Sequence, residues 1–355
     1  MPKEVVVVFV HGINVTCQDY YEKLRDKILK QMPKYAREWV VFRAVFWADI
    51  VRGRQQEYLL YARTAAGLKP TSLHKLVIEG LGDAASYQKT YSEGNSAYYN
   101  IQERLKGTIR DAALDKNDAR PLVFVGHSLG CHILSSFAWD VHKLKRPKGM
   151  LENDWENAIR FARTPTISKF MEHLDKEASP FERLDTLAGI VMMGSNMPLF
   201  TFTFGPQYVH PITRSASAEF EPAFPGPRVS EAIKKQARWL NFFSLNDPLG
   251  YPLKPLNDAY DEERRLFDTP VKSEGWLRAF FFRRWLRSLN ALSAHTGYWR
   301  NRRIARETAR MLHDIAFAEE IAAKKRKPRM NPLPREQNQE SAAAAQKPPP
   351  PTAPA

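Results

Sequence analysis

The chain has little cysteine: its 355 residues include only Cys17 and Cys131. Two cysteines cannot form the disulfide framework of a small secreted domain, and these two lack the spacing of metal ligands. The nine histidines form no H-E-x-x-H or similar pair. The sequence therefore predicts a protein of a reducing compartment that holds no metal and needs no cofactor.

Long hydrophobic runs are also absent. The N-terminal apolar run, residues 5–10, is too short for the core of a signal peptide, and no segment reaches the length of a membrane-spanning helix. The apolar content of 43% is nevertheless enough for a sizeable core. We expect a soluble, cytoplasmic, globular protein.

The net charge of +14 is unevenly distributed along the chain. Residues 275–329 carry 14 Lys and Arg against four acidic residues, and Trp276, Phe280 and Trp285 are interleaved with the arginines. One interpretation is a solvated helix face, which needs no partner. The other is peripheral contact with an anionic membrane through residues 275–329, and the bulky apolar residues favour lipid over nucleic acid as the partner.

Apolar runs alternate with segments of helical period. Runs typical of buried strands cover residues 5–10, 38–46, 122–125, 186–193 and 239–245. Between and after them lie predicted helices at residues 20–31, 97–114, 133–141 and 304–315. This alternation predicts the α/β class, with a mostly parallel, doubly wound sheet covered by helices on both faces.

We expect one domain over residues 1–325, with two insertions that form helical caps. The insertions lie at about 48–97 and 143–183, where the periodicity is poor. In the first, Asp83 and the tyrosines at 87, 91, 98 and 99 either line a pocket entrance or pack on the surface. From Lys324 onward the chain is basic and then rich in Pro, Gln and Ala, so the tail, 326–355, is predicted to be disordered.

A strand, a sharp turn and a helix surround Ser128. The run from Leu122 leads into Gly126-His127-Ser128-Leu129-Gly130, and a helical pattern follows. A turn this tight leaves no room for side chains beside the serine, which explains Gly126 and Gly130. The backbone of Ser128 is expected to be strained, with its hydroxyl presented as a nucleophile.

The first strand ends in His11-Gly12-Ile13. Gly12 lets the chain turn tightly, so that the backbone N–H of Ile13 can point at a developing oxyanion. His11 is expected to brace this loop by hydrogen bonds. His11, Gly12, Gly126 and Gly130 are therefore predicted to support the site.

A serine nucleophile needs a histidine base, and the base needs a carboxylate to orient it. Asp247 follows the strand at 239–245, and His295 precedes the final helix. Asp258 or Asp261 could replace Asp247, and His313 could replace His295. His127 is too constrained to serve as the base of Ser128 and is predicted to be structural.

These segments resemble the α/β-hydrolase superfamily, in its lipase and serine-esterase branch, over about residues 4–320. The resemblance rests on His11-Gly12, on the Ser128 turn, on Gly194-Ser195, and on Asp247 and His295 in the family's chain order. It implies an oxyanion hole from the backbone of Ile13 and Leu129, and an acyl ester on Ser128. The sheet is expected to lack the family's first two strands.

Two classes of function remain open. The first is a serine hydrolase that cleaves a carboxylic ester, such as a lipid ester, or else a thioester or an amide. The second is a non-catalytic binding or regulatory protein on a hydrolase scaffold. A complete Ser128, Asp247 and His295 set with an oxyanion loop favours the enzyme, because a scaffold has no physical need for all of these parts.

Overall fold

A computed structural model describes most of the chain: residues 1–71, 74, 77–88, 96–115, 117–143, 178–202, 204–205, 209–213, 223–272 and 295–326. The second predicted insertion lies outside the described residues, except for residue 143 and residues 178–183. The aromatic and arginine stretch at 276–287 and the tail from residue 327 also lie outside them.

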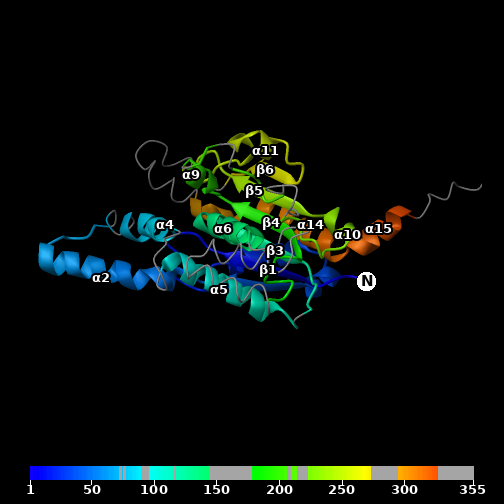
Figure 1. Cartoon of the computed structure of the whole chain (residues 1–355), viewed down its shortest axis with the longest axis horizontal. Helices are drawn as coiled ribbons and strands as arrows, with labels where there is room; N and C mark the ends of the chain where they lie inside the picture. Colours follow the sequence, from blue (N-terminus) through cyan, green and yellow to red (C-terminus); the bar gives the residue numbers. More distant parts are fainter. Residues whose placement is uncertain are drawn as a thin grey trace, which may run out of the picture.

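The core of the fold is a six-stranded sheet in the order β2-β1-β3-β4-β5-β6, in which every neighbouring pair is parallel (Figure 1). The strands are β1 (Val5–Val10), β2 (Val40–Val45), β3 (Leu122–His127), β4 (Leu187–Met193), β5 (Arg238–Phe243) and β6 (Leu266–Pro270). The predicted α/β class is confirmed. β6 is a strand that the periodicity did not predict.

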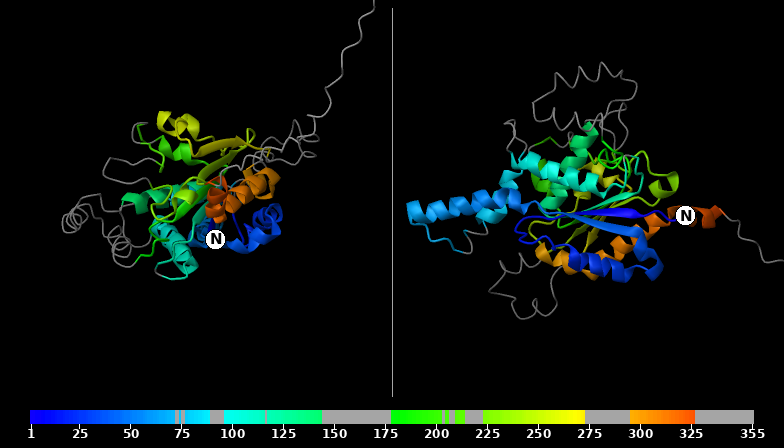
Figure 2. Two further views of the ribbon diagram at one scale, coloured as in Figure 1. Left: turned by 90° about the vertical axis from the view of Figure 1, so that its right-hand side faces the viewer. Right: turned by 90° about the horizontal axis from the view of Figure 1, so that it is seen from below.

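Helices cover both faces of the sheet, as the continuous apolar runs require. All six side chains of β1 are buried. Val6, Val8 and Val10 pack in one layer with α5 (Ala97–Ala112) and α6 (Leu129–Lys143), whereas Val5, Val7 and Phe9 pack in the other with α1 (Glu22–Gln31) and α14 (Arg302–Ala316). The left view of Figure 2 shows these two helical layers on either side of the strands.

The order of the strands reverses between β1 and β3. From β1 the chain moves outward to β2, then returns to place β3 on the other side of β1. The next helix after β1 is α1 on one face, and β3 leads into α6 on the opposite face. The loops that leave these two neighbouring strands therefore diverge at their carboxyl ends, and such divergence points are where doubly wound sheets bind ligands.

The first predicted insertion is helical and more regular than its sequence suggested. It contains α2 (Ala48–Ala66), the π-helical turn η2 (Val77–Leu81) and α4 (Gly82–Ser86), which together project from the body of the protein as an arm (Figure 1). Neither expectation for the tyrosines fits Tyr87 and Tyr98. Both are buried in the core with their ring centroids 4.8 Å apart, and Tyr91 lies outside the described residues.

The remaining described elements are short, apart from one helix at the C-terminal side. They are η1 (Lys34–Trp39), α9 (Met197–Thr201), α10 (Glu231–Lys234), η4 (Lys254–Leu256), α11 (Asp258–Asp261), η5 (Gly297–Arg300) and α15 (Ala318–Arg326). α15 ends at Arg326, the first residue of the predicted tail, and the rest of that tail lies outside the described residues. Among the described residues, no helix combines the length and the apolar character that crossing a membrane requires.

Candidate active site

Ser128 occupies the turn between β3 and α6 in a strained backbone conformation. Its φ is +54°, in the left-handed region that residues with side chains rarely adopt. Its N–H donates to the carbonyl of Met193 at the end of β4 (2.9 Å), and its own carbonyl accepts from the N–H of Cys131 (2.9 Å). The neighbouring strand and the new helix thus hold the turn in place.

Three glycines permit the close approach of backbone around Ser128. A Cβ on Gly12 would lie 2.4 Å from Cβ of Ser128, so only glycine lets the loop after β1 lie against the serine. A Cβ on Gly130 would lie 2.3 Å from the carbonyl oxygen of Val10, and one on Gly126 would lie 3.0 Å from the backbone of Cys131. The turn and the loop after β1 therefore form one tightly packed unit.

Asp247 and His295 form a buried pair at the end of β5. Nδ1 of His295 lies 2.9 and 3.0 Å from the two carboxylate oxygens of Asp247. The carboxylate also accepts the N–H of Leu249 (3.0 Å) and the hydroxyl of Tyr298 (2.7 Å). Burial by itself raises the pKa of Asp247, but the hydrogen bonds and the charge of its partners outweigh burial and hold the pKa below its ordinary value. The pair therefore presents an ionised carboxylate to the imidazole.

The end of β4 connects Ser128 to this pair. Met193 accepts the N–H of Ser128, and the next residue, Gly194, has a φ of +57°. A Cβ on Gly194 would lie 2.8 Å from the ring of Tyr298 and 3.0 Å from the carboxylate of Asp247. Glycine at this strand end thus allows the carboxylate to lie against the backbone.

His127 holds the segment that carries His295. Its Nε2 donates to the carbonyl oxygen of His295 (2.6 Å), and the two ring centroids are 4.9 Å apart. Burial lowers the pKa of His127 to about 3, so its ring is neutral at pH 7 and Nε2 carries the single proton. His127 therefore acts as a donor that positions His295.

His11 braces the loop after β1 with both ring nitrogens. Nδ1 donates to the carbonyl of Gly12 (2.7 Å), and Nε2 accepts the N–H of Trp47 (3.1 Å). The indole N–H of Trp47 donates a hydrogen bond to the carbonyl of His11 (2.9 Å), and the two rings are stacked. Burial lowers the pKa of His11 to about 3, which keeps this ring neutral as well.

The arm also binds this loop. Asn14, at φ +58°, donates its N–H to the carboxylate of Asp83 (3.3 Å), and Gln55 on α2 donates to the other oxygen of Asp83 (2.8 Å). Arg52 on α2 donates to the carbonyl of Val15. Burial raises the pKa of Asp83, although Gln55 and Asn14 oppose that rise. Asp83 thus joins the arm to the loop after β1.

Two backbone N–H groups beside Ser128 have no partner among the described residues. Those of Ile13 and Leu129 make no hydrogen bond within the described part of the chain. Leu129 is the first residue of α6, where an N–H has no partner inside the helix and the helix dipole is positive. These are the two donors that the resemblance implied.

Two side-chain atoms of the site are buried and unpaired. Oγ of Ser128 and Nε2 of His295 have no hydrogen-bond partner among the described residues. Ser128 is only 1% exposed, and His295 is also buried. Nε2 is the imidazole nitrogen of His295 that does not bond Asp247.

The alternative acid and base residues lie elsewhere. His313, on α14, contacts the hydroxyl of Tyr35 (3.1 Å) and the carboxylate of Asp314 (3.5 Å). Asp258 and Asp261 lie on α11 and make no hydrogen bond to His295 in the part of the chain that the structure describes. Of the alternatives in the sequence, the structure thus pairs only Asp247 with His295. Sequence reasoning missed Tyr298, because a tyrosine three residues after a histidine matches no motif.

A hollow on the described surface lies away from this site. It has a volume of about 600 Å³ and lies between α2 and α5, lined by Asp49, Ile50, Arg54, Asn100, Glu103, Arg104, Gly107, Thr108 and Asp111. An ion pair between Arg104 and Asp49 closes part of it (3.1 Å). Within the described residues, no group of three His, Cys, Asp or Glu side chains is placed to hold a metal ion.

Comparison of the chain with family models, with curated proteins and with solved structures found no match. The case for a function therefore depends on the geometry around Ser128, Asp247 and His295.

Proposed function

We propose that the protein is a serine hydrolase that cleaves a carboxylic ester through an acyl-serine intermediate, with lipid esters among its candidate substrates. Ser128 is the nucleophile, His295 the general base and Asp247 the carboxylate that orients it. The observation that carries the proposal is the buried Asp247–His295 pair, in which Nε2 of His295 has no partner among the described residues. Asp247 and the strained Ser128 both follow strands of the same sheet. Oγ of Ser128 and Nε2 of His295 are not hydrogen-bonded to each other in the structure, and each is buried with its bonding capacity unused by the described residues. Without substrate, the bond between a nucleophile and its base is often long.

The topology supports an α/β-hydrolase fold without its first two strands. Ser128 and Gly12 meet where the strand order reverses, and Asp247 follows a strand of the same sheet. The chain order Ser128, Asp247, His295 is that of this fold. Gly12, Ser128 and Asp247 all lie at the carboxyl ends of parallel strands, where doubly wound sheets perform their chemistry.

In the first step, Oγ of Ser128 attacks the ester carbonyl carbon while Nε2 of His295 takes the hydroxyl proton. The imidazolium that forms is stabilised by the ionised carboxylate of Asp247. The negative charge on the former carbonyl oxygen is met by the N–H groups of Ile13 and Leu129. When the C–O bond to the alcohol breaks, His295 returns the proton to the departing oxygen, and an ester on Ser128 remains.

In the second step, water attacks the acyl-serine. His295 removes a proton from the water, the same two N–H groups hold the second oxyanion, and the proton passes to Oγ as the acid leaves. Throughout, the bond from His127 to the carbonyl of His295 fixes the position of the base. The tautomer of His295 is fixed by Asp247.

The test is covalent labelling with a fluorophosphonate. The wild-type protein should be labelled at one site, and Ser128→Ala should lose the label while retaining its circular dichroism spectrum and melting temperature. Ser195→Ala removes another buried serine at a strand end and should retain the label. Stoichiometric labelling of Ser128→Ala would refute the assignment of the nucleophile.

A substrate panel separates the remaining alternatives. The wild-type protein should hydrolyse p-nitrophenyl esters, and the rate as a function of acyl chain length would reveal whether lipid-like chains are preferred. Faster turnover of matched thioesters or anilides would instead identify a thioesterase or an amidase. Wild-type protein that is neither labelled nor active on any of these would indicate a binding protein on a hydrolase scaffold.

A further inference from the structure

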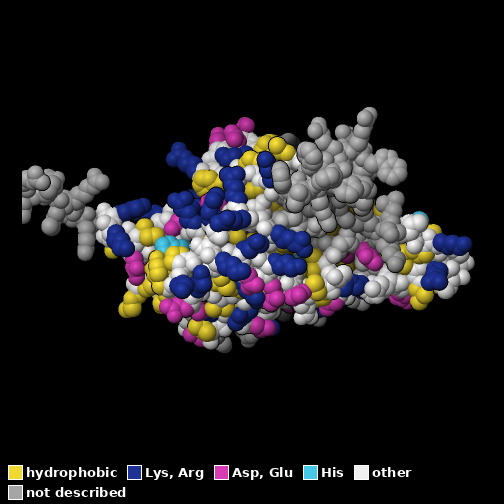
Figure 3. Space-filling view, turned by 180° about the vertical axis from the view of Figure 1, so that it is seen from behind, with side chains coloured by type: hydrophobic (Ala, Val, Ile, Leu, Met, Phe, Trp, Pro, Cys, Tyr) yellow, Lys and Arg dark blue, Asp and Glu magenta, His cyan; other side chains and the backbone are white. Residues whose placement is uncertain are grey.

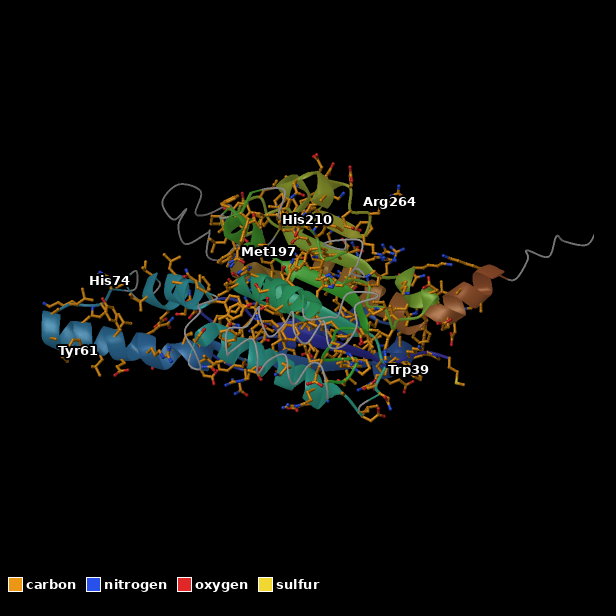
Figure 4. All side chains as sticks on the ribbon, viewed as in Figure 1. Trp39, Tyr61, His74, Met197, His210 and Arg264 are labelled. Atoms are coloured by element: carbon orange, nitrogen blue, oxygen red, sulfur yellow. The ribbon has the colours of Figure 1, made fainter. Side chains whose placement is uncertain are left out.

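The inner half of the arm holds the loop after β1. α2 follows β2 and runs outward, and Figure 4 shows Tyr61 near its outer end, well away from the sheet. In the space-filling view of Figure 3 the arm projects at the right-hand edge of the molecule. Contact with the loop is made by the inner turns of α2, where Arg52 donates to the carbonyl of Val15, and by Asp83 on α4.

Asp83 is the centre of this contact. Its Oδ2 accepts the N–H of Asn14 (3.3 Å), and its Oδ1 accepts the side-chain amide of Gln55 (2.8 Å). The carboxylate is 5% exposed, and burial raises its pKa because it disfavours the charged form. An apolar side chain would pack the arm without that cost. What Asp83 supplies in addition is an acceptor for a backbone N–H of the loop.

Asn14 needs support from its neighbours. Its φ of +58° lies in the left-handed region, which is unfavourable for a residue with a side chain. Gly80 of η2 comes close to it: a Cβ on Gly80 would lie 3.1 Å from Nδ2 of Asn14 and 3.4 Å from Cδ1 of Ile13. The arm thus binds the backbone of Asn14 and lies against the side chains of Asn14 and Ile13.

Ile13 lies between two attachments of the loop. On the side of the sheet, Gly12 lies against Ser128, where a Cβ would be 2.4 Å from Cβ of the serine. On the side of the arm, Asn14 is bound to Asp83. The N–H of Ile13 is unpaired in the residues that the structure describes, and it is one of the two donors proposed for the oxyanion. The direction of this N–H is therefore set by a contact on each side.

We propose that Asp83 is a positioning residue: by binding Asn14, it holds the N–H of Ile13 where the oxyanion forms. The inference rests on the proposed hydrolase function and adds that the arm is required for full turnover. Both oxygens of Asp83 are occupied, so the carboxylate acts through the loop and does not act on the substrate. An oxyanion donor stabilises the transition state more than the bound ester, so displacing it should lower kcat and leave KM nearly unchanged.

The experiment measures kcat and KM on p-nitrophenyl butyrate at pH 7. Asp83→Ala should lower kcat by about ten- to a hundredfold, less than the loss of about 10²–10³-fold that follows outright removal of an oxyanion-hole donor. Asp83→Asn should recover most of the lost kcat. Its amide oxygen can accept the N–H of Asn14, while the amide of Gln55 turns its oxygen toward the new NH₂ group.

Asp118→Ala is the matched control. Asp118 is also buried and accepts two backbone N–H groups, those of Leu114 and Arg120 (both 2.9 Å), but it precedes β3 and so lies at the amino ends of the strands. Its loss should lower the melting temperature and leave kcat unchanged. A fluorophosphonate should still label Asp83→Ala to completion, because the nucleophile and its base are intact.

Hydrogen exchange tests the contact without measuring activity. The peptide that contains Asn14 should exchange faster in Asp83→Ala than in the wild type, because its N–H has lost its acceptor. Wild-type kcat in Asp83→Ala, an equal loss of kcat in Asp118→Ala, or unchanged exchange would overturn the proposal while the wild type remained a hydrolase. A wild type that is neither labelled nor active would instead refute the proposed function, and this role of Asp83 with it.

Discussion

The carboxylate of Asp247 is the most tightly held group of the proposed site. It accepts hydrogen bonds from His295, Tyr298 and Leu249, and Gly194 and Gly250 lie against it because neither has a side chain. Tyr298 in turn accepts the N–H of Ser244, so its hydroxyl is fixed on both sides. A carboxylate held in this way can keep one tautomer of His295.

We expect Asp247→Asn to lower kcat on a p-nitrophenyl ester by about a thousandfold or more, because the amide can no longer hold His295 in the required tautomer. Asp258→Asn changes another acid, one that does not bind His295, and should retain the wild-type rate. Steady-state kinetics at pH 7 on both variants provide the measurement. Equal loss in the two variants would show that the effect is structural.

The same reasoning applies to the base. His295→Ala should lose activity to a similar degree, whereas His313→Ala should not, because His313 contacts Tyr35 and Asp314 and does not bond Asp247. If His313→Ala were the inactive variant, the base would have to be reassigned.

The roles of some single residues could be predicted from the sequence, and those of others could not. Ser128 and its glycines were predictable because the turn imposes a local steric pattern. Asp247 and His295 could be chosen over Asp258 and His313 only by their place after a strand and before a helix. Tyr298 and His127 gained their roles from contacts across 51 and 168 residues of chain, which no local pattern reveals.

At the scale of single elements, substituting alanine for each of two helical glycines is expected to change the free energy of unfolding in opposite directions. Gly53 lies inside α2, and a Cβ added there would have no heavy atom within 4 Å, so Gly53→Ala should raise the free energy of unfolding by about 0.5–1 kcal/mol. Gly130 lies in the first turn of α6, where a Cβ would meet the carbonyls of Val10 and His11. Gly130→Ala should therefore lower the free energy of unfolding by about 1–3 kcal/mol.

Urea unfolding followed by circular dichroism would measure both changes. A Gly130→Ala protein as stable as the wild type would mean that the loop after β1 can withdraw from the helix. In that case the close contact between Gly12 and Ser128 would not be rigid.

Elements were predictable where burial on both faces gave a long apolar run. β1, β3, β4 and β5 have such runs. β6 was not predictable because it is an edge strand of five residues that contains Asp268 and ends at Pro270. Asp268 is instead satisfied by tertiary contacts, accepting bonds from Asn241, Leu253 and Lys254. The helical period of α2 was hidden because its outer half is exposed on most sides and so carries no continuous apolar stripe.

For the whole molecule, buried neutral histidines should make stability depend on pH. Burial lowers the pKa of His11 and His127 to about 3, whereas a histidine in the unfolded chain takes up its proton near pH 6.5. Above about pH 6.5, His11 and His127 are neutral in both the folded and the unfolded state, so they do not lower the free energy of unfolding. Between about pH 6.5 and 3 the unfolded state binds protons that the folded state excludes, so stability is lost as the pH falls.

Each of these histidines should contribute a slope of about 1.4 kcal/mol per pH unit below pH 6. Urea unfolding at intervals from pH 7.5 to 4.5 would give the slope. His11→Gln should reduce it by that amount. An unaltered slope in His11→Gln would exclude this contribution.

The bond from His127 to His295 also bears on the order in which the protein matures. His127 binds the carbonyl of a residue 168 positions later, so the proposed nucleophile and the proposed base are made at well-separated times during translation. A ribosome adds about 5–20 residues per second, and N-terminal segments fold first. The early part of the sheet, with Ser128 and the oxyanion loop, therefore has several seconds in which to form before His295 emerges. During that interval the growing polypeptide holds Ser128 without the proposed base, so we expect it to be inactive toward esters until His295 has been added.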